Sequence, residues 1–200
     1  AVTGGAQMDG FADLITRLIS DASGQRLQVI RKEAVQLPGF FRATKEWDIL
    51  VINDKTLVAA IELKSHVGSF GNNFNNRAEE AIGSATDIWT AFKKGAFGSG
   101  PEPWLGYLIL LEDSPRARSP VKVQEPHFAV FPEFQGSSYS VRYELLCRKL
   151  VLERLYRAAA FLMSGPTGGR AGHFSEPAAD LVFANFSKSL AAQCSYYAHG

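Results

Sequence analysis

Two acidic residues and a lysine stand in two neighbouring segments whose composition favours β-strands. Asp48 lies in the first segment, Glu62 lies in the second, and Lys64 follows Glu62 by two positions. Turn-favouring residues separate the segments, so they form a predicted hairpin. With the turn on residues 54–56, positions whose numbers sum to about 110 lie opposite one another. Asp48 therefore faces Glu62 in this prediction.

The chemistry of these three side chains predicts a metal-dependent nuclease. Side chains alternate along a strand, so Lys64 and His66 point to the same face as Glu62. Two carboxylates at close range repel each other, and Mg²⁺, which prefers oxygen ligands, relieves that repulsion. We therefore expect Asp48 and Glu62 to bind Mg²⁺, which can activate water and neutralise a phosphodiester. The ammonium of Lys64 can stabilise the charge that grows in the transition state, so all three residues are predicted to be catalytic.

A Glu-x-Lys pattern is weak by itself, because alternating charges are common on solvated strand faces. Here Glu62 lies in the apolar run 58–63, where a charge without partners is costly. A buried salt bridge between Lys64 and either carboxylate is the structural alternative. That alternative leaves the second acidic residue unexplained.

The elements that must position these residues follow from hydrophobic periodicity and from turn residues. The prediction comprises a helix over 8–23, a strand over 27–31, hairpin strands over 47–52 and 57–63, a polar loop over 68–76, a helix over 78–92 with Asn76 as its N-cap, a strand over 104–111, a long helix over 139–163, a Gly-rich connector over 165–172 and a last helix from 178. The run 104–111 is almost purely apolar, which is typical of a central strand covered on both faces.

This order predicts the α/β fold class, with a mixed sheet in an αβββαβ core and additional C-terminal helices. A single domain is expected over 1–200, with its core at about 7–112 and a helical part at about 139–197. No Gly-rich fingerprint follows the first strand, which excludes a dinucleotide-binding fold. The chain begins with Ala1 rather than Met, so we expect that its N-terminus is truncated.

Composition restricts the remaining classes. Among 200 residues, 21 Lys and Arg stand against 20 Asp and Glu, so any DNA-binding surface must be local. Cys147 and Cys194 lack metal-ligand spacing, which favours a reducing, cytoplasmic location over a disulfide scaffold. No apolar stretch is long enough for a membrane helix, so no membrane partner is expected.

Residues that could contact DNA cluster after the predicted hairpin. Asparagine suits adenine edges or phosphates, although turn formation and helix capping explain an Asn-rich loop equally well. The candidates are Asn72, Asn73, Asn75, Asn76 and Arg77, together with His66 as a phosphate contact and Glu80 as a secondary site residue. His66 has the alternative of an ordinary surface histidine. Asp9 and Asp13 could reach a metal-bound water, but acids at the start of a helix are ordinarily caps or solvated charges.

Four motifs resemble the XhoI-type restriction endonucleases, over roughly half of the chain. They are Thr3-Gly4-Gly5 with Met8-Asp9-Gly10-Phe11, Trp47-Asp48-Ile49-Leu50, Ile61-Glu62-Leu63-Lys64-Ser65 and Gly71-Asn72-Asn73-Phe74-Asn75-Asn76-Arg77-Ala78-Glu79-Glu80-Ala81. The Asn-rich motif is the most specific of these. Trp47 is a departure, because it stands where the PD-(D/E)xK motif has proline.

The resemblance implies a Mg²⁺-dependent type II restriction endonuclease with Asp48, Glu62 and Lys64 as its catalytic residues. It also implies double-stranded DNA as substrate, the palindrome CTCGAG as target, a bacterial cytoplasmic location and a cognate DNA methyltransferase as functional partner. A palindrome requires two symmetric active sites, so a homodimer is expected.

Two other hypotheses remain at this stage. A repair or junction-resolving nuclease would use the same chemistry but read the shape of DNA. A non-catalytic DNA-binding module would keep the fold without the reaction, although nothing but catalysis needs both acids and the lysine together.

Overall fold

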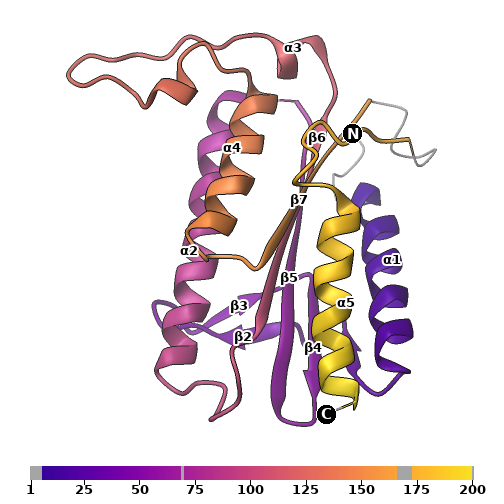
Figure 1. The fold of residues 1–200 in the computed structure, drawn as a ribbon. Helices are drawn as coiled ribbons and strands as arrows, with labels where there is room; N and C mark the ends of the chain where they lie inside the picture. The colour runs from indigo at the N-terminus through magenta and orange to yellow at the C-terminus, as the bar shows by residue number, and fades with distance from the viewer. Residues whose placement is uncertain (1–5, 69, 166–172, 200) are drawn as a thin grey trace.

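A five-stranded mixed sheet forms the centre of the molecule, with helices on both of its faces (Figure 1). The computed structural model describes residues 6–68, 70–165 and 173–199, so Thr3-Gly4-Gly5 and most of the predicted Gly-rich connector lie outside the described residues. The sheet contains, in spatial order, β1 (Gln28–Ile30), β4 (Ile49–Asn53), β5 (Thr56–His66), β6 (Trp104–Glu112) and β7 (Ala158–Ser164). β1, β4 and β5 pair antiparallel, whereas β5, β6 and β7 are parallel.

Helices cover the sheet in two layers (Figure 1). One layer contains α1 (Ala6–Ser23) and α5 (Phe183–His199), and the other contains α2 (Phe70–Lys93) and α4 (Tyr139–Leu152). Two short helices, α3 (Pro115–Arg118) and the 3-10 turn η1 (Pro132–Phe134), lie between β6 and α4. No helix in the described part of the chain has the length and apolar composition needed to cross a membrane.

The predicted fold class and αβββαβ order are confirmed by α1, β1, β4, β5, α2 and β6. The apolar strand β6 lies inside the sheet between β5 and β7, as expected. Its side chains alternate between the two layers: Tyr107 and Ile109 pack with α2 and α4, and Leu108 and Leu110 pack with α1 and α5. A strand buried on both faces has no polar position, which explains why its sequence does not alternate.

The β4–β5 hairpin has the predicted register at its functional end, although its turn is shorter than expected. Asn53 pairs with Thr56, so the turn contains two residues, with Asp54 in the left-handed region at φ 51°. The pairing then shifts by one position between Val51 and Ile52. This irregularity restores the sum of 110, because Ile49 pairs with Ile61. A β-bulge therefore brings Asp48 opposite Glu62, as expected from a longer turn.

The predicted polar loop over 68–76 is wrong, because α2 begins at Phe70 and contains the whole Asn-rich motif. Asn76 is therefore not an N-cap. Asparagine disfavours helix interiors, which is why the sequence predicts a loop. Tertiary packing overrides this preference: Phe70 and Phe74, one turn apart, are buried against Tyr139 and Tyr143 of α4.

The predicted helix over 139–163 is also wrong in its second half. α4 ends at Leu152, Arg154 adopts a left-handed φ of 57°, and residues 158–164 form strand β7. Alanine, leucine and methionine favour helices, so local preference predicts continuation. Pairing with β6 decides otherwise, because Ala160 and Phe161 bury opposite faces of the strand in the two layers.

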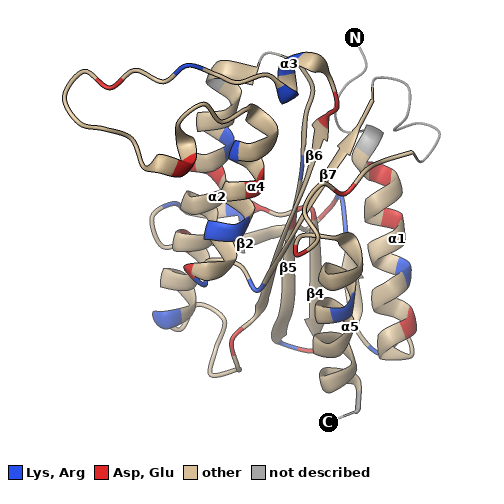
Figure 2. Cartoon of the chain, turned by 45° about the horizontal axis from the view of Figure 1, so that its top comes forward, with Lys and Arg blue, Asp and Glu red and all other residues tan. Residues whose placement is uncertain are grey.

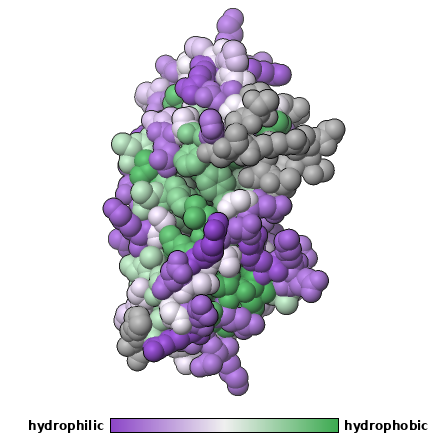
Figure 3. All heavy atoms as spheres, turned by 90° about the vertical axis from the view of Figure 1, so that its right-hand side faces the viewer, coloured by the Kyte–Doolittle hydropathy of each residue, from purple (hydrophilic) through white to green (hydrophobic). Residues whose placement is uncertain are grey.

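Lys and Arg residues are interspersed with Asp and Glu residues along the chain, in agreement with the net charge of +1 (Figure 2). The outer side of α1 and α5 is different in character, because apolar side chains gather there in patches between hydrophilic ones (Figure 3). Leu14 of α1 is 42% exposed on the helix surface, and Phe174 packs edge-on against Phe11 with ring centroids 5.6 Å apart.

A small second sheet, which the sequence does not predict, is fastened to α2. It consists of β2 (Gln36–Pro38) and β3 (Thr44–Glu46), which pair antiparallel. Asp87 of α2 is 3% exposed and accepts hydrogen bonds from the amides of Phe40 and Phe41 at 2.7 and 2.8 Å and from Arg42 Nε at 2.6 Å. A Cβ atom on Gly39 would lie 2.5 Å from Asp87 Oδ2, so only glycine permits this approach.

We expect Asp87→Asn to lower the free energy of unfolding by about 2 kcal/mol at pH 7, because a buried charged acceptor loses hydrogen bonds. Burial alone would raise the pKa of Asp87, but the bonds from Phe41, Arg42 and Phe40 outweigh it and hold that pKa below its ordinary value of 3.8. Because the pKa of Asp87 is lower in the folded than in the unfolded protein, its ionised form stabilises the fold at pH values above the ordinary pKa. This stabilisation is lost as the pH falls through the pKa of the folded state.

Urea unfolding of wild type and Asp87→Asn between pH 7 and pH 4 measures this effect, and the difference between them should begin to shrink near the lower limit. Asp13→Asn is the matched control, because Asp13 pairs with Arg31 at 2.6 Å but its side chain is 63% exposed. An exposed pair should contribute much less to the free energy of unfolding than the buried bonds of Asp87 do. Equal effects of the two substitutions would contradict an anchoring role for Asp87.

Candidate active site

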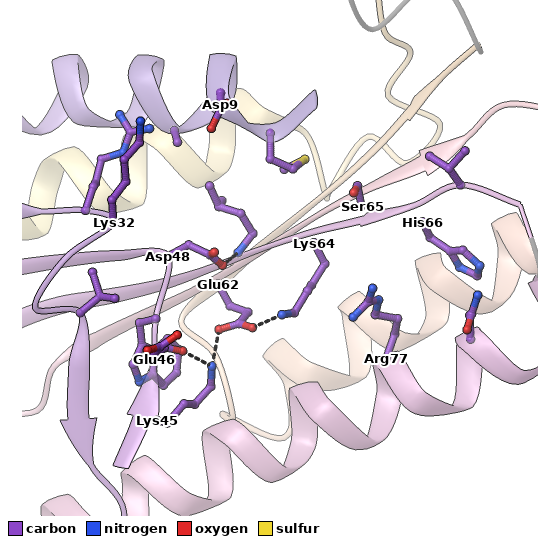
Figure 4. A pocket seen from close by; sticks show the side chains of 18 residues that line it. Asp9, Lys32, Lys45, Glu46, Asp48, Glu62, Lys64, Ser65, His66 and Arg77 are labelled. Atoms are coloured by element: carbon purple, nitrogen blue, oxygen red, sulfur yellow. Dashed lines mark hydrogen bonds and ion pairs between the residues drawn. The ribbon is translucent and has the colours of Figure 1, made fainter. Parts of the chain in front are cut away.

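A cavity of about 990 Å³ opens between α1, the β2–β3 sheet and α2, with β5 as its floor. Figure 4 shows the side chains that line it. They are Met8, Asp9, Ala12, Arg31, Lys32, Val35, Lys45, Glu46, Trp47, Asp48, Glu62, Leu63, Lys64, Ser65, His66, Val67, Asn73 and Arg77. All three predicted catalytic residues are among them, so the hairpin brings Asp48, Glu62 and Lys64 to one cavity. Their catalytic roles stay predictions.

Backbone pairing holds Asp48 beside Glu62. The Asp48 amide donates to the Ile61 carbonyl at 3.2 Å, and the Leu63 amide donates to Asp48 Oδ2 at 2.7 Å. Glu62 is buried, and its Oε1 forms an ion pair with Lys64 Nζ (Figure 4). Glu62 and Lys64 are therefore positioned by β5 itself, and Asp48, one residue before β4, is positioned by its hydrogen bonds to β5.

The environment of Asp48 opposes its ionisation. Enclosure within the protein raises the pKa of Asp48, and the negative charge of Glu62 raises it further. The Leu63 amide and the ammoniums of Lys64 and Lys45 act in the opposite direction but do not compensate fully. The Asp48 carboxylate still meets solvent through the open cavity. A cation placed beside the two acids would relieve this repulsion.

Lys45 is a member of the site that the sequence analysis missed. It belongs to β3, and its Nζ lies 2.7 Å from Glu62 Oε2. A Pro-Gly break between two short segments that alternate in polarity could have indicated the β2–β3 hairpin. No local pattern, however, relates Lys45 to a glutamate on a different sheet.

His66 is buried rather than exposed, which corrects the expectation of a surface residue. Its Nδ1 lies 2.5 Å from Tyr143 Oη, and its ring centroid lies 5.0 Å from that of Phe70. It lines the cavity on the same face as Lys64, as alternation predicts. These contacts make His66 a link between β5 and α4, and its phosphate contact stays a prediction.

The Asn-rich motif contributes two residues to the cavity. Asn73 and Arg77 lie one helical turn apart on α2 and both line it. Asn75 and Asn76 are exposed and do not line it, and the side chain of Asn72 lies outside the described residues.

The secondary acids differ in position. Glu80 is half-exposed, outside the cavity lining, and its Oε2 accepts from Arg77 Nη1 at 2.7 Å, so the structure shows it as a partner of Arg77. Asp9 lines the cavity from α1, whereas Asp13 pairs with Arg31.

The side chains present fit a hard divalent cation held by few protein ligands. Within the described residues, no group of three or more His, Cys, Asp or Glu is arranged to hold a metal. Two carboxylates with the remaining positions filled by water and substrate oxygens suit Mg²⁺, which keeps several waters when bound. Asp48 and Glu62 could provide such a pair.

Comparisons with known proteins agree on one family. The family model described as restriction endonuclease XhoI matches residues 1–176. The type II restriction enzyme BstVI of Geobacillus stearothermophilus is 58% identical over 196 residues, which are 95% of this chain and 88% of that enzyme. The type II restriction enzyme XhoI of Xanthomonas vasicola is 52% identical over 155 residues, 76% of this chain and 62% of that enzyme.

A third relative, the type II restriction enzyme AbrI of Azospirillum brasilense, is 53% identical over 123 residues, which are 60% of this chain and 55% of that enzyme. The chain thus spans less than two thirds of XhoI and AbrI, but most of BstVI. No solved structure matches the chain. With a family match over most of its length and relatives above half identity, this chain belongs to the XhoI family of type II restriction endonucleases.

Proposed function

We propose that this protein is a Mg²⁺-dependent endonuclease that cuts double-stranded DNA at the palindrome CTCGAG. The observation that carries the proposal is the convergence of Asp48, Glu62 and Lys64 in one cavity lined by further cations. Family membership supports a type II restriction activity. Mg²⁺-dependent linearisation of a plasmid with a single CTCGAG site tests it.

In this proposal the residues of the cavity have separate roles in the reaction. Asp48 and Glu62 hold the cation, and the Leu63 amide keeps the Asp48 carboxylate in place. When bound, Mg²⁺ supplies an activated water and neutralises charge on the phosphate. Lys64, on the same face as Glu62, presents its ammonium to the scissile phosphate and to the water that attacks it.

The cavity also contains basic side chains that could contact DNA phosphates, interspersed with acidic ones. Cations line the cavity from four different elements or loops, although the whole chain carries only +1. They are Arg31, Lys32, Lys45, Lys64 and Arg77. Phosphate contacts of this kind position the DNA without reading its sequence.

We expect Arg77→Ala to weaken DNA binding about tenfold at low salt, because it removes a phosphate contact from the cavity. Glu80 then loses its partner, but it is half-exposed and remains solvated. Fluorescence anisotropy with a labelled duplex in Ca²⁺ measures binding without cleavage, since Ca²⁺ places the attacking water poorly.

Asn76→Ala is the matched control on the same helix, because Asn76 is exposed and outside the cavity lining. It should bind DNA within about twofold of wild type, as surface substitutions usually do. Weakening by Asn76→Ala to the same extent as by Arg77→Ala would place the DNA outside the cavity.

The target site and assembly rest on the resemblance and on symmetry. We propose cleavage after the first cytosine of CTCGAG, which leaves four-base 5′ overhangs. A palindrome presents two equivalent scissile bonds, so two copies of this chain related by a two-fold axis would act together. A cognate methyltransferase would protect the host DNA at the same sites.

A further inference from the structure

The carboxylate of Glu62 is engaged on both of its oxygens by lysines. Oε1 pairs with Lys64, and Oε2 lies 2.7 Å from Lys45 Nζ (Figure 4). The Glu62 side chain is 5% exposed, and those of Lys45 and Lys64 are 13% and 23% exposed. In such an enclosed setting, a charged group persists only with partners.

The two lysines reach Glu62 from separate parts of the fold. Lys64 belongs to the same strand as Glu62, whereas Lys45 belongs to the β2–β3 sheet. Lys45 Nζ also donates to the Glu46 carbonyl at 2.7 Å and lies 4.6 Å from the centroid of the Trp47 ring. Asp87 binds Phe40 and Arg42 between β2 and β3, and so fastens to α2 the small sheet to which Lys45 belongs.

A divalent cation at Glu62 would therefore compete with the two ammonium groups that already pair with this carboxylate. Asp48 and Glu62 carry two negative charges, and Lys45 and Lys64 balance them within the same cavity. An incoming metal ion therefore meets two acids balanced by two lysines, and a Glu62 carboxylate on which each oxygen already has a cationic partner. Removing Lys45 would free Oε2 and leave one negative charge to attract the ion.

We propose that Lys45 competes with the divalent cation for Glu62 in the DNA-free protein, and that it yields this place when DNA enters the cavity. The inference rests on the proposed function, because a DNA phosphate is the group that draws the ammonium of Lys45 away from Glu62. Metal binding and DNA binding are thereby coupled, and each must strengthen the other by the same factor. Lys45 is a positioning residue in this scheme, and its effect is exerted through Glu62.

The test is isothermal titration of Mn²⁺ into the full chain without DNA. We expect Lys45→Met to bind Mn²⁺ about fivefold to tenfold more tightly than wild type, as the loss of a partly buried ion pair implies. Lys45→Arg keeps the charge and should stay within about twofold of wild type. Glu62→Gln identifies the heat that belongs to this site.

Lys32→Met is the control for charge alone. Lys32 lines the same cavity but forms none of the ion pairs found among the described residues. It should tighten Mn²⁺ binding much less than Lys45→Met does. Thermal unfolding verifies that each variant is folded, and Lys45→Gln replaces Lys45→Met if the methionine variant is not.

The coupling is measured by repeating the titration with Ca²⁺ in the presence and absence of a CTCGAG duplex. DNA should tighten Ca²⁺ binding less in Lys45→Met than in wild type. Equal or weaker Mn²⁺ binding by Lys45→Met in the DNA-free protein would overturn the competition. If the wild-type protein binds Mn²⁺ through Glu62 but does not cut DNA, the proposed function is wrong. The titration without DNA still decides the role of Lys45 in that case.

Discussion

Asp48→Asn, Glu62→Gln and Lys64→Ala are each expected to lower the rate of DNA cleavage at least about a thousandfold, because each removes a charge that acts at the reacting phosphate. The asparagine and glutamine variants keep the shape of the side chain, and Lys64 is not part of either hydrophobic cluster. The fold should therefore persist, and circular dichroism checks it. Plasmid cleavage under single-turnover conditions measures the rate.

Glu46→Gln is the matched control for this series. Glu46 lines the same cavity, but its carboxylate is exposed and accepts from Gln36 Nε2 at 2.8 Å rather than facing Glu62. Its cleavage rate should stay within about tenfold of wild type, since it makes no contact with the reacting groups. A Lys64→Ala variant that cleaves within the same range would show that the assignment of the catalytic lysine is wrong.

A plasmid with one CTCGAG site should be linearised. A plasmid in which one base pair of the site is changed should be cut at least about a hundredfold more slowly. Two symmetric subunits would each read one half-site, so one wrong base pair leaves donors and acceptors of one subunit without partners. Asn73 is the candidate reader from the Asn-rich motif, because it lines the cavity beside Arg77, which is the proposed phosphate contact. Sequencing the ends of the linear product tests the expected four-base 5′ overhang.

Other outcomes of the plasmid assay would favour a different function for this protein. Equal cutting of both plasmids would favour a nuclease that reads DNA shape, as in repair or junction resolution. Binding of both plasmids without cutting would favour a DNA-binding module that has kept the fold. Accumulation of singly nicked circles would contradict a dimer that cuts both strands in one encounter.

Short-range patterns were sufficient to predict that Asp48, Glu62 and Lys64 meet in one place, while their catalytic roles stay predictions. Alternation along a strand put Glu62 and Lys64 on one face, and a turn between two β-rich segments placed Asp48 opposite them. The register was right although the turn was wrong, because the bulge at Val51 and Ile52 compensates for a turn one residue shorter than expected. The apolar run of β6 likewise predicted a strand covered on both faces, since neither face of such a strand has polar side chains to meet solvent.

Tertiary structure alone decided the features in which distant segments meet. Local preference favours a loop at the Asn-rich motif and a helix over 158–163, but the packing of Phe70 and Phe74 on α4 and the pairing of β7 with β6 outweigh those weak preferences. Burial of His66 against Tyr143 depends on the same packing.

Lys45 is the clearest example of this limit. Its contact with Glu62 joins residues 17 positions apart on two different sheets, and it depends on how Asp87 of α2 fastens the β2–β3 hairpin. Hydrophobic periodicity reports which face of an element is buried, so it determined the elements and the side chains that share a strand pair. It carries no information on which charged side chain of another element completes an ion pair, and only the packed structure decides that.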